Sequence, residues 1–461
     1  MKQHIHVVGI GGTGLSAIAK VLIERGYQVS GSDRSPSIYF DAITKLGAQT
    51  YLGHAAENVI GADLVIRSSA ITDENPEVLA AISAGIPVLK RSDFLEILTS
   101  GSVTLAVAGT HGKTTTTGML ISILTELNQD PSFIIGALVK PYETNAKSGN
   151  GPYFVIEADE YDHMFLGLNP TIAVITNIEH DHPDCFPTPQ DYLNEFKSFA
   201  HRVKPDGDLL LCIDDEGIKN LLMDITDLPC KVVTFGTNPY AEYQATNVMV
   251  NKDGLPEFDM VHLLPSNEVR LVGRVKLSLP GMHNVYNALA ALIVSHIIGI
   301  EDEKAIEVIE SYHGTERRFE VVGIKSGVTV IDDYAHHPTQ ITSTIQAARQ
   351  RYHHQRIWAI WEPHTYTRPA AMEDEYIASL DIADQVIVTR IYAARETDNG
   401  YTPLAIVNGL SDGKGSYIPD YSDLVKSLAK NLLTGDIVLV LSAGNGPLIS
   451  KMLLHELNIN G

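Results

Sequence analysis

The most restrictive feature of the sequence is a glycine loop between an apolar strand and a helix. Residues 103–108 (VTLAVA) are typical of a buried strand, residues 109–113 (GTHGK) form the loop, and a helix with apolar residues on one face follows from Thr114. Backbone N–H groups and the positive end of the helix dipole face an anion in such a turn. The loop therefore predicts a nucleoside triphosphate site, in which Lys113 neutralises the outer phosphates and Thr114 offers a hydroxyl to Mg²⁺.

The loop is shorter than the common phosphate-binding pattern. The spacing G-x-x-x-x-G-K-[ST] would place glycine at position 107, where this chain has Val107. An ordinary glycine turn before a helix is the alternative interpretation. The strand before the loop and the four threonines after it favour nucleotide binding.

A second glycine loop, residues 9–14 (GIGGTG), lies near the N-terminus. It matches G-x-G-x-x-G between a strand and a helix, and Asp33 ends the next strand. The glycines allow close approach of a diphosphate, and the acid is suited to a ribose hydroxyl. Any nucleotide diphosphate fits this pattern as well as a dinucleotide does, and a purely structural tight turn is the alternative.

The order of elements predicts an α/β fold in three domains. At ~150 residues per domain, 461 residues correspond to about three domains. Short apolar strands alternate with helical patterns almost throughout, which favours parallel sheets covered by helices. A more polar, alternating stretch from Tyr240 to about Pro280 reads as an antiparallel addition. We expect domains at residues 1–100, 101–314 and 315–461.

Composition restricts the partners and the compartment. The formal charge is −22, which argues against a nucleic-acid partner because phosphate backbones require clustered Lys and Arg. Three cysteines without a C-x-x-C pair fit a reducing compartment. No apolar run approaches the ~20 residues of a membrane span, and the N-terminus does not resemble a signal peptide. We expect a cytoplasmic monomer or homodimer without membrane insertion.

Acidic and histidine-rich clusters follow two strands of the central region. Residues 157–162 (EADEYD) and 180–184 (HDHPD) come after apolar runs. A strand end beside a phosphate-binding loop is where carboxylates meet a phosphate-bound cation, so these clusters predict a site for Mg²⁺ or Mn²⁺. The alternatives are a solvated charge run and structural histidines.

Three further polar clusters lie near or within the third domain. Residues 317–320 (RRFE) precede 332–338 (DDYAHHP), and residues 363–368 (PHTYTR) follow another strand. Arginine binds phosphate in bidentate fashion and aspartate binds ribose hydroxyls. In residues 280–287 (PGMHNVYN), asparagine side chains are suited to a base edge, with helix capping as the alternative.

Taken together, these motifs resemble the Mur ligase family of ATP-dependent, amide-forming enzymes of peptidoglycan synthesis. The resemblance covers essentially the whole chain in the family's order of domains, through VVGIGGTGLSAIA, SSAITDENPE, AGTHGKTTTT, EADEYD, TNIEHDH, PGMHNVYNALAA, RRFE and DDYAHHPT. It implies a Rossmann-like N-terminal domain, a central P-loop ATPase-like domain and a C-terminal Rossmann-like domain. It also implies cell-wall biogenesis, and with it cell shape and cell division, as the process served.

The resemblance implies a reaction and two possible amine substrates. GTHGKTTT, DDYAHHPT and PHTYTR are most similar to family members that join L-alanine to the carboxylate of UDP-N-acetylmuramate through an acyl phosphate. EADEYD and DDYAHHP also resemble relatives that attach a ready-made tripeptide to the same sugar nucleotide. Thr365 and Arg395 differ from the alanine-ligase pattern, where arginine and glycine are usual.

The resemblance also assigns roles to residues. The catalytic residues would be Lys113, Glu157 and His182, and the metal ligands Thr114, Glu157 and His182, with Glu160 as a competing carboxylate. The UDP-sugar would be bound by Gly11, Gly12, Thr13, Gly14, Asp33, Ser68 and Ser69. ATP would be bound by Gly109, Thr110, His111, Gly112, Lys113, Thr114, Thr115, His283, Asn284, Asn287, Arg318 and Asp333. The amino acid would be bound by Tyr334, His336, His364 and Arg368.

Two other functions fit parts of the sequence. An NAD-dependent oxidoreductase would explain the first glycine loop and leave GTHGKT unexplained. A nucleotide-binding regulator without activity would be expected to lack Lys113 or the metal carboxylates, which are present.

Overall fold

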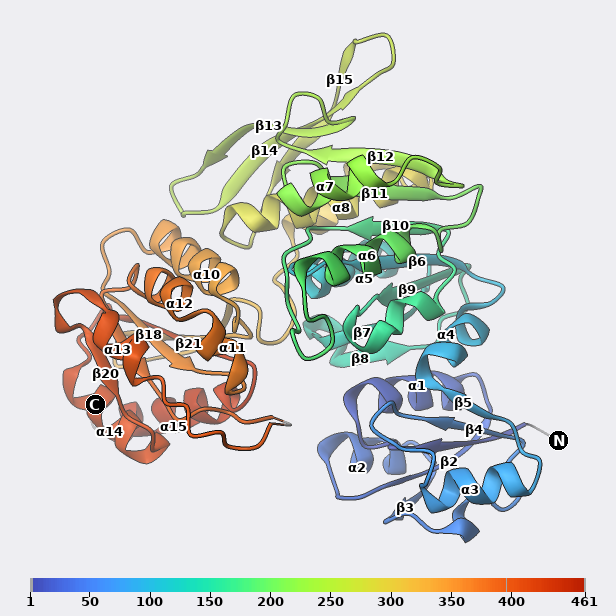
Figure 1. Ribbon diagram of the computed structural model, residues 1–461. Coiled ribbons are helices and arrows are strands. Elements are labelled where there is room, and N and C mark those ends of the chain that lie inside the picture. The colour runs from blue at the N-terminus through green and yellow to red at the C-terminus, as the bar shows by residue number, and fades with distance from the viewer. Residues whose placement is uncertain (1–2, 395, 460–461) are drawn as a thin grey trace. The chain divides into compact units, whose positions relative to one another are not determined.

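A computed structural model describes residues 3–394 and 396–459, so Arg395 lies outside the described residues. Its contacts divide the chain into two compact units (Figure 1). The first comprises residues 1–245, 260–273 and 286–308, and the second comprises residues 246–259, 274–285 and 309–461. Each is described separately below.

The first sheet is parallel and has five strands in the order β3-β2-β1-β4-β5. Its strands are β1 (His4–Val8), β2 (Gln28–Asp33), β3 (Gln49–Leu52), β4 (Leu64–Arg67) and β5 (Val88–Lys90). Its helices are α1 (Thr13–Glu24), α2 (Ile38–Lys45), η1 (Ala56–Val59), α3 (Pro76–Ser83) and α4 (Arg91–Thr99). The strand order reverses beside β1, and ligands of such sheets bind at this switch point. The first glycine loop leaves β1 there.

The second sheet has ten strands in the order β15-β14-β13-β12-β11-β10-β6-β9-β7-β8. The strands are β6 (Val103–Ala108), β7 (Ser132–Val139), β8 (Thr144–Lys147), β9 (Tyr153–Glu157), β10 (Ile172–Ile175), β11 (Asp208–Cys212), β12 (Lys231–Gly236), β13 (Tyr243–Val250), β14 (Pro256–Leu263) and β15 (Val269–Lys276). The helices are α5 (Lys113–Glu126), η2 (Lys140–Tyr142), η3 (Tyr161–Gly167), α6 (Pro189–Ala200), α7 (Glu216–Asp224), α8 (Met282–Ile297) and α9 (Asp302–Glu310).

Parallel pairing fixes what surrounds the phosphate-binding loop. Strand β6 lies between β9 and β10, with Val107 opposite Glu157 and Ala108 opposite Ile175. The segments that follow these three strands therefore emerge at the same edge of the sheet. The predicted antiparallel addition corresponds to β13–β15. The turn between β13 and β14 is closed by a hydrogen bond from the N–H of Asn251 to Leu255 O.

The third sheet lies in the second unit, with the order β16-β17-β21-β18-β19-β20. Its strands are β16 (Glu320–Lys325), β17 (Val328–Asp333), β18 (Ile357–Glu362), β19 (Gln385–Val388), β20 (Gly415–Tyr417) and β21 (Ile437–Ser442). Its helices are α10 (Pro338–Arg351), α11 (Thr367–Ala371), α12 (Glu373–Leu380), α13 (Leu404–Gly409), η4 (Ser411–Gly413), α14 (Tyr421–Asn431) and α15 (Gly446–Ile459). All its neighbouring strands are parallel except β16 and β17.

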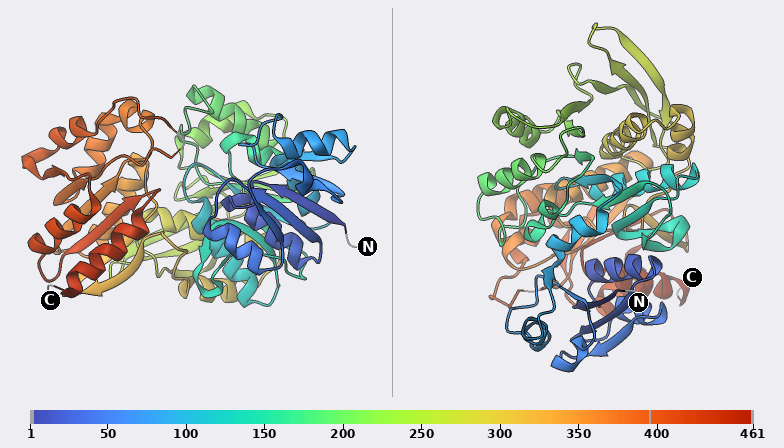
Figure 2. Two further views of the ribbon diagram at one scale, coloured as in Figure 1. Left: turned by 90° about the horizontal axis from the view of Figure 1, so that it is seen from below. Right: turned by 90° about the vertical axis from the view of Figure 1, so that its right-hand side faces the viewer.

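Alternate residues of the third sheet pack into two different cores. Ala359 and Trp361 of β18 belong to the core that includes α10 and α12, whereas Trp358 and Ile360 belong to the core under α14 and α15. Figures 1 and 2 show these helix pairs on opposite faces of the sheet. Burial on both faces explains why its parallel strands read as continuous apolar runs in the sequence.

The α/β class predicted from the sequence is confirmed. The predicted strand at residues 103–108 matches β6. Strands β3, β7, β8, β16 and β20 were not predicted. No helix in the described part of the chain is long and apolar enough to cross a membrane.

Candidate active site

The phosphate-binding loop runs from the end of β6 to the first turn of α5. Gly109 and Gly112 have φ values of 125° and 84°, which other residues rarely adopt. A Cβ at Gly109 would lie 2.1 Å from Thr176 Oγ1, and one at Gly112 would lie 2.4 Å from Asn287 Oδ1. Both positions therefore require glycine.

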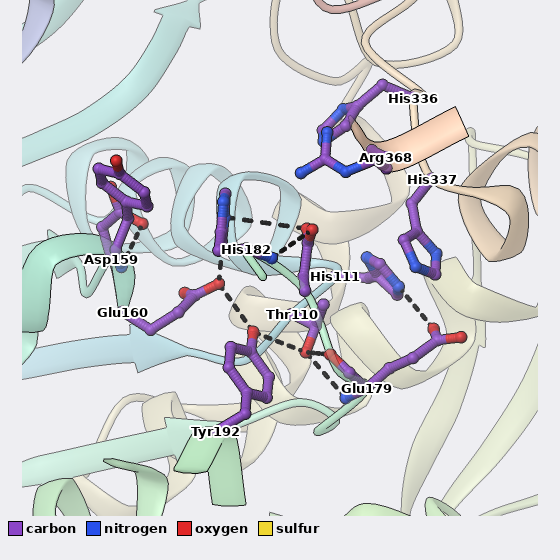
Figure 3. Close-up of polar contacts among 12 residues, drawn as sticks. Thr110, His111, Asp159, Glu160, Glu179, His182, Tyr192, His336, His337 and Arg368 are labelled. Carbon is purple, nitrogen blue, oxygen red and sulfur yellow. Dashed lines mark hydrogen bonds and ion pairs between the residues drawn. The ribbon is translucent and has the colours of Figure 1, made fainter. Parts of the chain in front are cut away.

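Residues after β10 hold the loop backbone in place. The N–H of His111 donates to Asn177 Oδ1 at 2.9 Å, and Thr176 Oγ1 donates to His111 O at 2.5 Å. The His111 imidazole lies 2.7 Å from a Glu179 carboxylate oxygen (Figure 3). The predicted nucleotide-binding loop is thus held by the segment that follows the neighbouring strand β10.

Lys113 lies folded along this loop. Its Nζ donates to Gly109 O at 2.6 Å, to Thr110 O at 3.4 Å and to Glu160 Oε2 at 2.7 Å. Burial disfavours the charged amine, but the neighbouring carboxylates, led by Glu160, raise the pKa of Lys113 above its ordinary value. Lys113 is therefore a fixed positive charge in the loop.

Thr114 and Glu157 provide a pair of oxygen ligands beside Lys113. Thr114 Oγ1 donates to Glu157 Oε1 at 2.9 Å, and the N–H of Gly136 donates to Glu157 Oε2 at 2.7 Å. Thr114 and Thr115 are buried in the first turn of α5. A hydroxyl and a carboxylate at a phosphate loop are the hard oxygen ligands that Mg²⁺ prefers, so these residues fit the predicted metal.

His182 lies near the carboxylates of Glu160 and Asp181. Its Nε2 is 3.9 Å from Glu160 Oε1 and 3.8 Å from Asp181 Oδ2. Within the described residues, no ion pair joins His182 to Glu157. Glu160, which the sequence left as a competing metal carboxylate, is 1% exposed and forms an ion pair with Lys113.

The residues predicted for adenine binding have different surroundings. Asn287 on α8 contacts the loop, because its Oδ1 accepts a hydrogen bond of 3.2 Å from Thr116 Oγ1. Asn284 Nδ2 donates to Pro280 O at 2.7 Å. The His283 ring lies against Gly281, where a Cβ would be 2.5 Å from His283 Cε1.

The first glycine loop is joined to the predicted ribose-binding acid. The N–H of Gly11 donates to Asp33 Oδ2 at 2.9 Å. Helix α1 begins at Thr13 after Gly12, without a side-chain cap or an acidic residue in its first turn. Ser68 Cβ lies beside Gly9, and Ser69 lines a cavity of about 650 Å³.

Arg91, which the sequence analysis missed, lies against this loop. A Cβ at Gly14 would be 1.9 Å from Arg91 Nη1. The Nε of Arg91 donates to Met164 Sδ at 2.9 Å, and burial lowers its pKa against the opposing effect of Asp159 and Asp162. A guanidinium beside the positive end of a helix dipole favours the binding of an anion between them. The basic pair in LKRSD, at a strand end before a helix, was the available signal.

The four residues predicted for amino-acid binding lie together in the second unit. The ring of His336 is 5.3 Å from that of Tyr334 and 5.5 Å from that of His364. Arg368 Nη1 lies 3.1 Å from His364 Nδ1. Between them, Thr365 has a φ of 63°, which is strained for a β-branched residue.

Arg318 and Asp333, the residues of the third domain that were predicted to bind ATP, lie next to this cluster. The guanidinium of Arg318 lies over the Tyr334 ring, 5.1 Å from its centre. Asp333 accepts hydrogen bonds from the N–H groups of Phe319 at 2.7 Å and Ala335 at 2.8 Å. Burial raises the pKa of Asp333, and Arg318 opposes that rise.

The fold and the site define an α/β protein with two glycine loops in its first unit and a cluster of polar and aromatic side chains in its second. The chain belongs to the Mur ligase family, as the motifs predicted. Residues 4–102 match the family model described as "Mur ligase family, catalytic domain", residues 107–295 "Mur ligase middle domain" and residues 317–444 "Mur ligase, glutamate ligase domain".

Relatives match along the whole chain. The UDP-N-acetylmuramate–L-alanine ligase of Caldanaerobacter subterraneus is 40% identical over 98% of both chains, and that of Alkaliphilus metalliredigens is 38% identical over 98% of this chain and 97% of the relative. The solved structure of the UDP-N-acetylmuramate–alanine ligase of Thermotoga maritima is 27% identical, with a TM-score of 0.80 over 99% of this chain and 100% of that one. A murein peptide ligase of Psychrobacter arcticus is 25% identical, with a TM-score of 0.70 over 99% and 98%.

Proposed function

We propose that this chain is an ATP-dependent ligase that joins L-alanine to the carboxylate of UDP-N-acetylmuramate. The observation that carries the proposal is the hydrogen bond between Thr114 and Glu157, beside the Lys113 charge at one edge of the second sheet. It combines a fixed cation, a glycine loop and two oxygen ligands, which is what phosphoryl transfer requires. The choice of L-alanine rests on the relatives with about 40% identity over nearly the whole chain.

The first step is transfer of a phosphoryl group to the sugar carboxylate. A carboxylate oxygen attacks the γ-phosphorus of ATP in line, the bond to the β-phosphate oxygen breaks, and ADP leaves. Lys113 and the positive end of the α5 helix dipole neutralise the negative charge on the phosphoryl oxygens. Thr114, Glu157 and, in our proposal, His182 would hold Mg²⁺ or Mn²⁺, which adds charge neutralisation on the phosphates when bound.

The second step forms the amide bond. The amine of alanine attacks the acyl carbon, loses a proton, and the resulting tetrahedral intermediate expels phosphate. Tyr334, His336, His364 and Arg368 form the proposed amine pocket, and the clustering of their rings and guanidinium supports it. Arg318 and Asp333 are proposed to bind the nucleotide from the second unit.

The sugar nucleotide is proposed to bind at the first glycine loop. Gly11–Gly14 and Arg91 would hold the diphosphate, Asp33 the ribose, and Ser68 and Ser69 the adjoining part of the substrate. The uncapped start of α1 and the position of Arg91 support this assignment. Since ATP and nucleotide sugars are cytoplasmic metabolites, we propose that the enzyme acts in the cytoplasm, as a monomer or homodimer.

Phosphate release tests the choice of amine. The enzyme is incubated with ATP, Mg²⁺ and UDP-N-acetylmuramate, and single amino acids or the murein tripeptide are added in turn. We expect turnover with L-alanine. Turnover with the tripeptide alone would instead indicate the activity named for the murein peptide ligase, and no release with any amine would contradict the proposal.

A further inference from the structure

Tyr192 belongs to none of the sequence motifs, yet its hydroxyl lies inside the phosphate-binding site. It lies on α6 and is 1% exposed. Its hydroxyl donates to Glu160 Oε1 at 2.9 Å and lies 3.1 Å from Thr110 Oγ1 (Figure 3). Because the side chain is fully buried, it acts on the reaction only through the residues it contacts.

The hydrogen-bond donors and acceptors around Tyr192 fix the direction of each bond. The ammonium of Lys113 can only donate, so Glu160 Oε2 accepts, and Glu160 Oε1 accepts from the Tyr192 hydroxyl. The Tyr192 oxygen is then left to accept from the Thr110 hydroxyl, whose hydrogen is shared with Glu179 O at 2.9 Å. The N–H of Glu179 donates to Thr110 Oγ1 at 2.9 Å.

We infer that Tyr192 is a positioning residue for phosphoryl transfer. It holds Glu160 in the orientation that fixes the Lys113 ammonium, and it fastens Thr110 of the loop to the same carboxylate. Without the hydroxyl, Glu160 Oε1 loses its shortest hydrogen bond and the loop loses its link to α6. The inference rests on the proposed function to the extent that ATP is the nucleotide bound by this loop.

The ring of Tyr192 is held by other aromatic side chains, which fix the position of its hydroxyl. Its centre lies 5.2 Å from those of Phe186 and Phe196 and 6.0 Å from that of His180. The start of α6 is fixed by a capping box between Thr188 and Asp191. A group held in this way does not have to be ordered when the phosphates arrive.

His182 is the other group that faces Glu160 Oε1, at 3.9 Å. Because that distance exceeds a hydrogen bond, Tyr192 is the nearer partner of this oxygen. Loss of the Tyr192 hydroxyl is therefore expected to disturb the position of Glu160, because His182 is too distant to form the missing hydrogen bond. The prediction concerns placement of Lys113 and requires no change of protonation at either residue.

The test is Tyr192→Phe, which keeps the ring and removes only the hydroxyl. We expect kcat/KM for ATP to fall about tenfold, the loss of one hydrogen bond to a charged group, while KM for L-alanine stays within twofold. Tyr142→Phe is the matched control, because its hydroxyl donates to Glu126 Oε1 at 2.8 Å on the surface of the same unit. That variant is expected to behave as the wild type.

A double-mutant cycle with Glu160→Gln separates positioning from general destabilisation. If Tyr192 acts through Glu160, the double variant has the kcat/KM for ATP of Glu160→Gln alone, within twofold. Three results would each overturn the inference. The effects of Tyr192→Phe and Glu160→Gln on kcat/KM could multiply in the double variant, Tyr192→Phe could behave as the wild type, or Tyr192→Phe could change the KM values for ATP and L-alanine equally.

Calorimetric binding of the non-hydrolysable analogue AMP-PNP keeps this test independent of the ligase assignment. The wild type is expected to bind the analogue several-fold more tightly than Tyr192→Phe, with no sugar nucleotide or amine present. Weaker binding by the variant supports the inference even if the wild type releases no phosphate with L-alanine. Equal binding by both proteins contradicts it.

Discussion

Replacement of Lys113 by alanine should damage stability and catalysis through two separable effects. The side chain forms an ion pair of 2.7 Å with Glu160, which is 1% exposed. Removal of one partner of a buried pair leaves the other charge uncompensated, which typically costs about 3–5 kcal/mol. Because Glu160 keeps the hydrogen bond from Tyr192, we expect the lower value, about 3 kcal/mol.

Thermal melting and phosphate release distinguish the two effects. At about 2–4 °C per kcal/mol for a large domain, Lys113→Ala should melt about 6–12 °C below the wild type. Adding Glu160→Gln removes the uncompensated charge and should recover most of this loss. The catalytic defect should remain, at least about 100-fold in kcat, because the cation that stabilises the transferring phosphoryl group is still absent. A wild-type melting temperature for Lys113→Ala, or ligation that survives the substitution, would refute the reasoning.

Three further substitutions test other parts of the account. Although burial opposes the shift, the nearby His6 imidazole and hydrogen bonds from Ser32 and Asn58 lower the pKa of Glu77 to about 2. A lowered pKa of Glu77 stabilises the fold above pH 4.5, and this stabilisation is lost as the pH falls toward 2. In acid titrations the free energy of unfolding of the wild type should therefore fall by about 3 kcal/mol, and that of Glu77→Gln should not show this loss. Arg91→Gln should raise the KM for UDP-N-acetylmuramate about tenfold. The control variant Arg270→Gln on β15 should leave this KM unchanged. Equal KM values for the two variants would argue against an anion at Arg91. Thr365→Gly should relieve the backbone strain at φ 63° and stabilise the second unit by about 1 kcal/mol. The KM for the amine should rise in the same variant. An unchanged KM would show that the strained backbone plays no part in the amine pocket.

The parts of the site that follow from strand order were predictable from the sequence. Parallel strands end at one edge, so the loop after β6 and the carboxylate at the end of β9 were expected together, and Thr114 contacts Glu157 as a consequence. The four residues of the amine cluster were likewise expected at strand ends. Their motifs are local, and the sheet brings the strand ends together.

The parts that depend on side-chain packing between distant elements were not predictable. Glu160 was weighed as a metal ligand, and its side chain forms an ion pair of 2.7 Å with Lys113. Tyr192 lies in none of the sequence motifs, and its contacts with Glu160 and Thr110 depend on the packing of α6. The position of Arg91 at the first glycine loop depends on how α4 packs beside α1, which no local pattern encodes.

The most direct test of the central claim follows oxygen from the sugar carboxylate to phosphate. UDP-N-acetylmuramate labelled with ¹⁸O in its carboxylate is incubated with the enzyme, ATP, Mg²⁺ and L-alanine, and the inorganic phosphate is analysed by mass spectrometry. Attack of the carboxylate on the γ-phosphate, followed by amide formation, predicts one ¹⁸O atom in each phosphate released. Unlabelled phosphate accompanying amide formation would contradict the acyl-phosphate route and the role assigned to the Lys113 site.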